Sequence, residues 1–258
     1  MAWKLKKTAQ SIPKLNDPIL IEGLPGIGNV GKVAVDFMIE ELGAKKIYEM
    51  TSFSLPHSVF VAEDNLVELP VIELYCRRFN GKRRDLLFLA GDIQPIDERS
   101  CHEFCYAILD LLRELGGKEI VTIGGIGLPT VPERPKVYCT GNSKRIVDRY
   151  KRGVRANDKL YGVVGPIVGV TGLLTGLATD RGIEAVCLLA ETYGHPLYLG
   201  MKGSQEVLKI LDKKLGLRLN LKGLNKEIKE IEEEIIKRTD QLTAGRPAGQ
   251  GREVSYIG

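Results

Sequence analysis

The chain has 258 residues, of which 43% are hydrophobic and 27% are charged, and its formal net charge is +4. This length suits one large α/β domain or one domain with appendages, and the composition is that of an ordinary globular protein. The charge is too small, and the Lys/Arg runs are too short, to indicate a nucleic-acid partner or binding to an anionic membrane.

The first half of the chain alternates apolar runs with amphipathic ones. Residues 1–18 lack the apolar segment of a signal peptide and no run is long enough to span a bilayer, so we expect a cytoplasmic protein without a membrane partner. Residues 18–24, PILIEGL, are typical of a buried strand, and the apolar stripe of residues 29–43 predicts a helix. Shorter strands with a hairpin turn are expected up to residue 79, followed by a buried strand over residues 85–92.

The second half repeats this alternation. The pattern predicts helices over residues 96–115, 143–150, 169–181 and 201–216, with strands over residues 135–140 and 183–194. The segment KEIVTIGGIGLPT, residues 118–130, is typical of a strand followed by a glycine loop. Strands that alternate with helices predict an α/β fold with a central, mostly parallel sheet between helices.

The C-terminal region differs in composition from the rest of the chain. The sequence predicts a core over residues 1–222, an amphipathic helix over residues 223–240 and a flexible tail over residues 241–258. The helix has a narrow apolar stripe that suits a partner, and the tail has an apolar tip that is typical of a docking peptide. The predicted partner-binding residues are Ile228, Ile231 and Ile235 in the helix, and Val254, Tyr256 and Ile257 at the tip.

One glycine-rich loop raises the question of phosphate binding. Gly26, Gly28 and Gly31 satisfy the G-x-G-x-x-G pattern between a predicted strand and a predicted helix, as dinucleotide sites require. With Lys32 they also nearly match the phosphate loop of NTPases, but that pattern needs Ser or Thr next and the chain has Val33. The alternative is a tight turn that lets the helix approach the sheet, and these residues alone leave both interpretations open.

The other candidates for acid–base chemistry are isolated. Asp92 and Glu191 each follow a buried strand, which is the usual rim for active sites, but each also suits a turn or a helix cap. His57 and His195 are flanked by turn residues, and hydrogen-bonded loop histidines are more common than catalytic ones. We therefore expect no catalytic residue set.

Cysteine spacing predicts no metal site. Cys101 and Cys105 would share one face of a helix, with His102 between them, but no second pair completes four ligands. Cys76 and Cys187 lie in apolar runs and are typical of small buried side chains. No metal and no cofactor is expected.

Several segments, taken in order, resemble the proteasome assembly chaperone family, and in particular its archaeal members that are similar to the second eukaryotic chaperone. The resemblance covers residues 17–217 and implies an α/β fold related to nucleoside-phosphorylase-like folds, homo-oligomerisation and protein binding rather than catalysis. The segments that carry it are EGLPGIGNVGKVAVDFMIEELGA, LAGDIQP, TIGGIG, GVTGLLTGLATDRGIEAVCLLAET and GSQEVLKILDKKLG.

The resemblance predicts a non-enzymatic, cyclic homo-oligomer that recruits proteasome α-subunits or another family member through its C-terminal extension. Members that engage the proteasome are similar to activators that end in a hydrophobic residue, a tyrosine and any residue. This chain ends Tyr256-Ile257-Gly258, so that Ile257 stands in the tyrosine position. Two alternatives follow: a scaffold for a different partner protein, and a nucleotide- or phosphate-binding enzyme that uses Gly26, Gly28, Gly31 and Lys32.

Overall fold

The computed structural model describes residues 3–223, except residues 10, 13, 63, 163, 196 and 197. Residues 1–219 form one compact unit, and residues 220–258 are assigned to a second. The predicted helix over residues 223–240 lies outside the described residues apart from its first residue, and the predicted tail lies wholly outside them, so these boundaries stay predictions. None of the described helices is long and apolar enough to cross a membrane.

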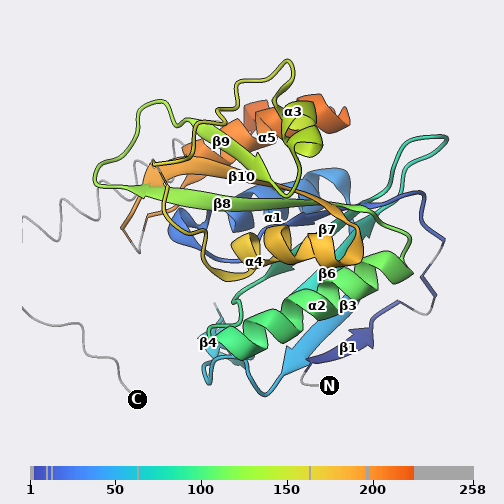
Figure 1. Ribbon diagram of the computed structural model, residues 1–258. Helices are drawn as coiled ribbons and strands as arrows, with labels where there is room; N and C mark the ends of the chain where they lie inside the picture. The colour runs from blue at the N-terminus through green and yellow to red at the C-terminus, as the bar shows by residue number, and fades with distance from the viewer. Residues whose placement is uncertain are drawn as a thin grey trace, which may run out of the picture. The chain divides into compact units, whose positions relative to one another are not determined.

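An eight-stranded mixed sheet forms the centre of the first unit (Figure 1). The three inner pairings, β7 with β2, β2 with β8 and β8 with β10, are parallel, and the pairings on either side of them are antiparallel. This arrangement confirms the α/β class and confines the parallel part to the middle of the sheet. In spatial order the strands are β1 (Trp3–Lys7), β3 (Lys45–Ser52), β6 (Ile72–Arg77), β7 (Leu86–Gly91), β2 (Ile19–Glu22), β8 (Glu119–Leu128), β10 (Glu184–Tyr193) and β9 (Val137–Gly141).

Helices cover both faces of this sheet. Figure 1 shows α2 (Glu98–Glu114) and α4 (Gly169–Leu177) in front of the sheet, and α1 (Val30–Leu42) and α5 (Met201–Leu215) behind it. The helices of each pair pack on each other, and α3 (Lys144–Lys151) packs on β9 and β10. Because both faces are covered, β2 and β7 are buried along their whole length, which is why β7 is continuously apolar and β2 is apolar up to its last residue, Glu22.

Local signals in the sequence explain the ends of the helices on both faces. Helix α1 ends at Gly43, which adopts the left-handed conformation and donates its N–H to the carbonyls of Glu40 and Ile39. Helix α2 begins after Asp97, whose side chain accepts a hydrogen bond from the Ser100 N–H. The predicted helix over residues 169–181 is α4 followed by the 3₁₀ helix η2 (Ala178–Arg181).

The prediction of a loop at the glycines of TIGGIG is wrong. Strand β8 continues through them to Leu128 and pairs with β10 along its whole length. The glycines are needed because neighbouring groups approach this strand closely: a Cβ on Gly124 would lie 2.9 Å from the Leu189 side chain. Glycine here marks close packing against a strand rather than a turn.

Candidate functional site

The glycine loop leaves the carboxyl end of β2 and enters α1 through the 3₁₀ helix η1 (Ile27–Asn29). A Cβ on Gly31 would lie 2.5 Å from the carbonyl oxygen of Ile123 in β8. Gly28 has φ +61°, and a Cβ there would lie 2.5 Å from the Thr192 hydroxyl oxygen in β10. These two glycines therefore allow the start of α1 to lie directly on the sheet, whereas a Cβ on Gly26 would meet nothing within 4 Å.

Lys32 is engaged by the sheet and by its own helix. Its ammonium lies 3.1 Å from the Asp36 carboxylate and 3.6 Å from that of Asp92, and it donates a hydrogen bond of 3.1 Å to the Gly91 carbonyl. Two carboxylates thus already neutralise this cation at the end of β7. A phosphate-loop lysine has to reach the phosphates of a bound nucleotide, so this geometry favours a structural role for the loop.

Ligand addition tests the phosphate alternative directly. We expect ATP, NAD and inorganic phosphate to leave the unfolding temperature of the full chain unchanged, because the Lys32 ammonium is paired with Asp36 and Asp92. A ligand at a hundred times its dissociation constant would stabilise the fold by about 2.7 kcal/mol. Differential scanning fluorimetry detects such a gain. A shift that Lys32→Ala abolishes would re-establish the phosphate interpretation.

Glu22, the last residue of β2, is a fully buried carboxyl group next to this loop. The Leu24 N–H donates a 2.9 Å hydrogen bond to its Oε1 atom, and the Thr171 hydroxyl donates one of 3.1 Å to its Oε2 atom. Burial raises the pKa of Glu22 from 4.5 to about 7, although these hydrogen bonds act in the opposite direction. The Glu22 carboxyl group therefore gains or loses its proton near neutral pH.

A cavity of about 480 Å³ lies between the glycine loop, the glycines of β8 and the segment that precedes α4. Gln94 joins two of its walls, because its amide donates to the Pro25 carbonyl at 2.6 Å and accepts from the Val170 N–H at 3.0 Å. Thr171 lines the cavity and binds Glu22, so a buried ionisable group lies one residue behind the wall. The cavity occupies the carboxyl-end rim of the parallel part of the sheet, the usual position of a binding site in α/β folds.

Comparison with known proteins identifies the family of this chain. Residues 20–238 match the PAC2 family. The chain belongs to this family. It is 28% identical to the uncharacterized protein MJ1210 of Methanocaldococcus jannaschii over 265 residues, which cover 98% of this chain and 97% of that protein.

Two solved structures from Pyrococcus furiosus share the fold of this PAC2 protein. PbaB, described as an archaeal proteasome activator, is 33% identical, with a TM-score of 0.81 over 92% of this chain and 98% of that chain. PbaA, described as an archaeal homolog of proteasome-assembly chaperone, is 24% identical, with a TM-score of 0.73 over 94% of each chain. These similarities confirm the resemblance that the sequence segments indicated.

The isolated candidates in this PAC2 protein hold loops and strands in place. Asp92 accepts a 3.2 Å hydrogen bond from the Val71 N–H and lies beside Lys32. Glu191 accepts hydrogen bonds from the Lys136 N–H at 2.9 Å and from the Tyr138 hydroxyl at 3.1 Å, which attaches β9 to β10. Of the histidines, His195 stacks on Tyr193 and His57 lies exposed in a loop.

No group of three or more His, Cys, Asp or Glu side chains in the described ranges is placed to hold a metal ion. Cys101 and Cys105 are buried free thiols on α2, and His102 between them points to the exposed side of the helix. The predicted partner-binding residues Ile228, Ile231, Ile235, Val254, Tyr256 and Ile257 lie outside the described residues, so that assignment stays a prediction.

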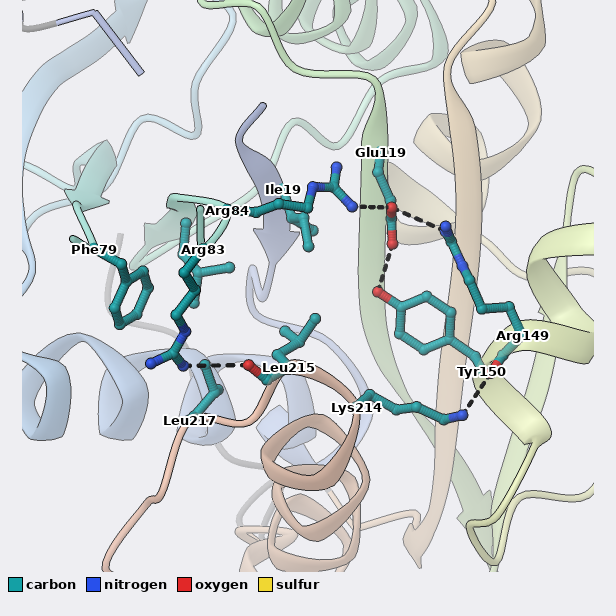
Figure 2. Close-up of a pocket in the computed structure, with 11 residues that line it drawn as sticks. Ile19, Phe79, Arg83, Arg84, Glu119, Arg149, Tyr150, Lys214, Leu215 and Leu217 are labelled. Atoms are coloured by element: carbon teal, nitrogen blue, oxygen red, sulfur yellow. Dashed lines mark hydrogen bonds and ion pairs between the residues drawn. The ribbon is translucent and has the colours of Figure 1, made fainter. Parts of the chain in front are cut away.

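A second cavity, of about 220 Å³, opens at the amino ends of β2, β7 and β8 (Figure 2). The Glu119 carboxylate at its edge accepts a hydrogen bond from the buried Tyr150 hydroxyl at 2.7 Å. It also pairs with the guanidinium groups of Arg149 at 2.9 Å and Arg84 at 2.5 Å. Burial and the nearby carboxylate raise the pKa of Tyr150 well above its ordinary value.

The two remaining cations of this cavity bind main-chain oxygens at helix ends. Arg83 donates to the Leu215 carbonyl at 3.2 Å, at the end of α5, and Lys214 donates to the Arg149 carbonyl at 2.5 Å, in the last turn of α3 (Figure 2). Arg83 also donates to the Gly216 carbonyl at 2.8 Å, and Lys214 to the Arg152 carbonyl at 2.6 Å. Each cation therefore satisfies carbonyls that a helix leaves unpaired at its C-terminus. The network therefore serves as a structural connection between β8, α3 and α5. The sequence analysis predicted neither this network nor the role of Glu22, although in both cases an acidic residue within an apolar strand was a visible signal.

Proposed function

We propose that this protein is a non-enzymatic, proteasome assembly chaperone-like factor that forms a cyclic homo-oligomer and recruits a protein partner through its C-terminal extension. The observation that carries the proposal is the 33% identity to PbaB, a proteasome activator, over 92% of the chain with a TM-score of 0.81. The match to the PAC2 family over residues 20–238 supports it, since the match covers the core and much of the predicted helix. The partners that fit are proteasome α-subunits or another family member.

The proposed recruitment relies on weak contacts that repeat around the oligomer. Burying Val254, Tyr256 and Ile257 would contribute a few kcal/mol per tail, part of which is lost when the tail becomes ordered on binding. Several tails on one oligomer raise the effective concentration of each further contact, so avidity supplies the remaining affinity. The stripe of Ile228, Ile231 and Ile235 would add a helical contact to the same partner.

Removal of residues 253–258 tests this recruitment. We expect the truncated protein to lose capture of proteasome α-subunits and to keep its oligomeric mass, because the core carries self-association. A pull-down, with size-exclusion chromatography and light scattering, measures both. Ser255→Ala, which changes the tail without touching its apolar side chains, serves as the matched control and should bind normally.

Two outcomes would redirect the proposal. Unchanged capture by the truncated protein would exclude the apolar tip as the contact. An intact oligomer that ignores α-subunits, with or without its tail, would favour the alternative of a scaffold for a different partner. The comparison of capture with and without the tail matters because Ile257 stands in the position where proteasome activators have a tyrosine.

A further inference from the structure

Apolar surface is concentrated in one short stretch of the chain. Of the twelve large hydrophobic side chains that are exposed in the described part of the protein, seven lie between residues 53 and 69. Phe53 is 100% exposed, and Leu69 is 74% exposed. We refer to these seven side chains as the hairpin patch: Phe53, Val59, Phe60, Val61, Leu66, Val67 and Leu69.

The hairpin patch is built around a small, well-formed hairpin. Strands β4 (Phe60–Val61) and β5 (Val67–Glu68) form a two-stranded sheet that is separate from the eight-stranded one (Figure 1). The Leu66 carbonyl accepts the Ala62 N–H at 2.8 Å, and the Asp64 carboxylate accepts the Leu66 N–H at 3.0 Å. Isolated two-stranded hairpins are marginally stable in water, so a partner that covered this element would stabilise it.

The area of the hairpin patch is that of a protein interface. The exposed fractions of the seven side chains correspond to nearly five whole side chains. At about 150 Å² for each side chain the seven together expose roughly 700 Å², which is shared between the two faces of the hairpin because successive strand residues point to opposite sides. A standard interface takes about 800 Å² from each partner.

We propose that the hairpin patch is the self-association surface, and that its occupant is the same patch, or adjoining surface, of a second copy of this chain. This inference rests on the proposed function and names the surface through which the homo-oligomer forms. Monomeric proteins rarely leave this much apolar surface exposed, and a second copy is the partner that is always present. The seven side chains are themselves uncharged, so apolar atoms would meet apolar atoms where the patch contacts its symmetric copy.

The edges of the main sheet offer no comparable route to association. Strand β1, at one edge, carries Lys4, Lys6 and Lys7, and lysines on an edge strand disfavour pairing with another chain. Strand β9, at the other edge, exchanges hydrogen bonds with Asn157 along its free side. Strand addition is thus opposed at both edges of the main sheet.

The test replaces a cross-strand pair and leaves the hairpin intact. Val61 and Val67 lie opposite each other in the β4–β5 ladder, so the double variant Val61→Lys, Val67→Glu introduces charges that attract across the strands. The matched control is Ile96→Lys, Val168→Glu, which charges two exposed apolar side chains outside the patch. Size-exclusion chromatography with light scattering gives the mass of each full-length protein, and circular dichroism checks its fold.

We expect the wild type and the control to share one oligomeric mass, and the hairpin variant to fall to the 28.5 kDa of a single chain. Phe53→Lys changes a side chain outside the ladder and should weaken self-association at least tenfold. This variant serves as the test if the double variant misfolds.

An oligomer of wild-type mass in both patch variants would overturn the inference and leave the proposed function standing. The same holds if the control alone dissociates, or if the patch variants keep their mass and lose α-subunits instead. A monomeric wild type would overturn both proposals.

Discussion

The free energy of unfolding is expected to fall by about 3 kcal/mol between acid and weakly alkaline pH on account of Glu22 alone. The pKa of this buried carboxyl is raised from 4.5 to about 7 in the folded protein. Between these values the folded state holds a proton that the unfolded state has lost. The stabilisation is therefore complete below about pH 4.5 and disappears as the pH rises through 7.

Glu22→Gln tests this expectation because glutamine keeps the volume and an oxygen that accepts from the Leu24 N–H, presents an NH2 donor to the Thr171 hydroxyl oxygen, and does not ionise. Urea unfolding at pH 5 and pH 8 should show a smaller loss of stability in the variant than in the wild type, by roughly 2–3 kcal/mol. Glu133→Gln, at an exposed loop position, is the control and should follow the wild type. Parallel pH profiles for wild type and Glu22→Gln would show that the carboxyl stays ionised in the fold.

Gly31→Ala is expected to destabilise the protein by about 1–3 kcal/mol, although alanine normally favours a helix over glycine. Its Cβ would lie 2.5 Å from the Ile123 carbonyl oxygen and 3.1 Å from the Gly23 Cα atom. Both neighbours are main-chain atoms of the sheet and loop, so neither can move without lifting α1 from the sheet. Thermal or urea unfolding of the variant measures the cost.

Two other glycines provide matched controls for this substitution. Gly26 has an extended backbone, with φ −160°, and a Cβ there meets nothing within 4 Å, so Gly26→Ala should change stability little. Gly176 lies within α4, again with open space at its Cβ position, and Gly176→Ala should stabilise the fold by about 0.5–1 kcal/mol. Equal effects at Gly26 and Gly31 would contradict a purely steric role for the loop and favour a shared ligand.

Elements with a strong local pattern were predictable. The strand over residues 18–24 and the helix over residues 29–43 correspond to β2 and α1. Both were predictable because a largely apolar run and a stripe of apolar side chains at helical spacing are direct signs of burial. The end of the first helix at Gly43 was also predictable, since capping depends on adjacent residues. Local sequence thus decided which segments are helices and which are buried strands.

Strand β1 was not predicted, because its formation depends on a distant partner. Its five residues, WKLKK, pair with β3 some forty residues later, and Trp3 packs against Phe104 of α2 at 4.6 Å between ring centroids. The end of β8 was missed for a similar reason. Glycines that suggest a turn are held extended there by the neighbouring β10.

The sequence by itself determined the class of fold, the helix ends and the family, since each depends on short segments of adjacent residues. Only the tertiary structure decided what the glycine loop touches, where Lys32 is neutralised and why Glu22 holds a proton. The Thr171 hydroxyl that binds Glu22 lies 149 residues away in the chain. Desolvation and charge pairing depend on such neighbours in space, and a single sequence records the residues without recording which of them meet.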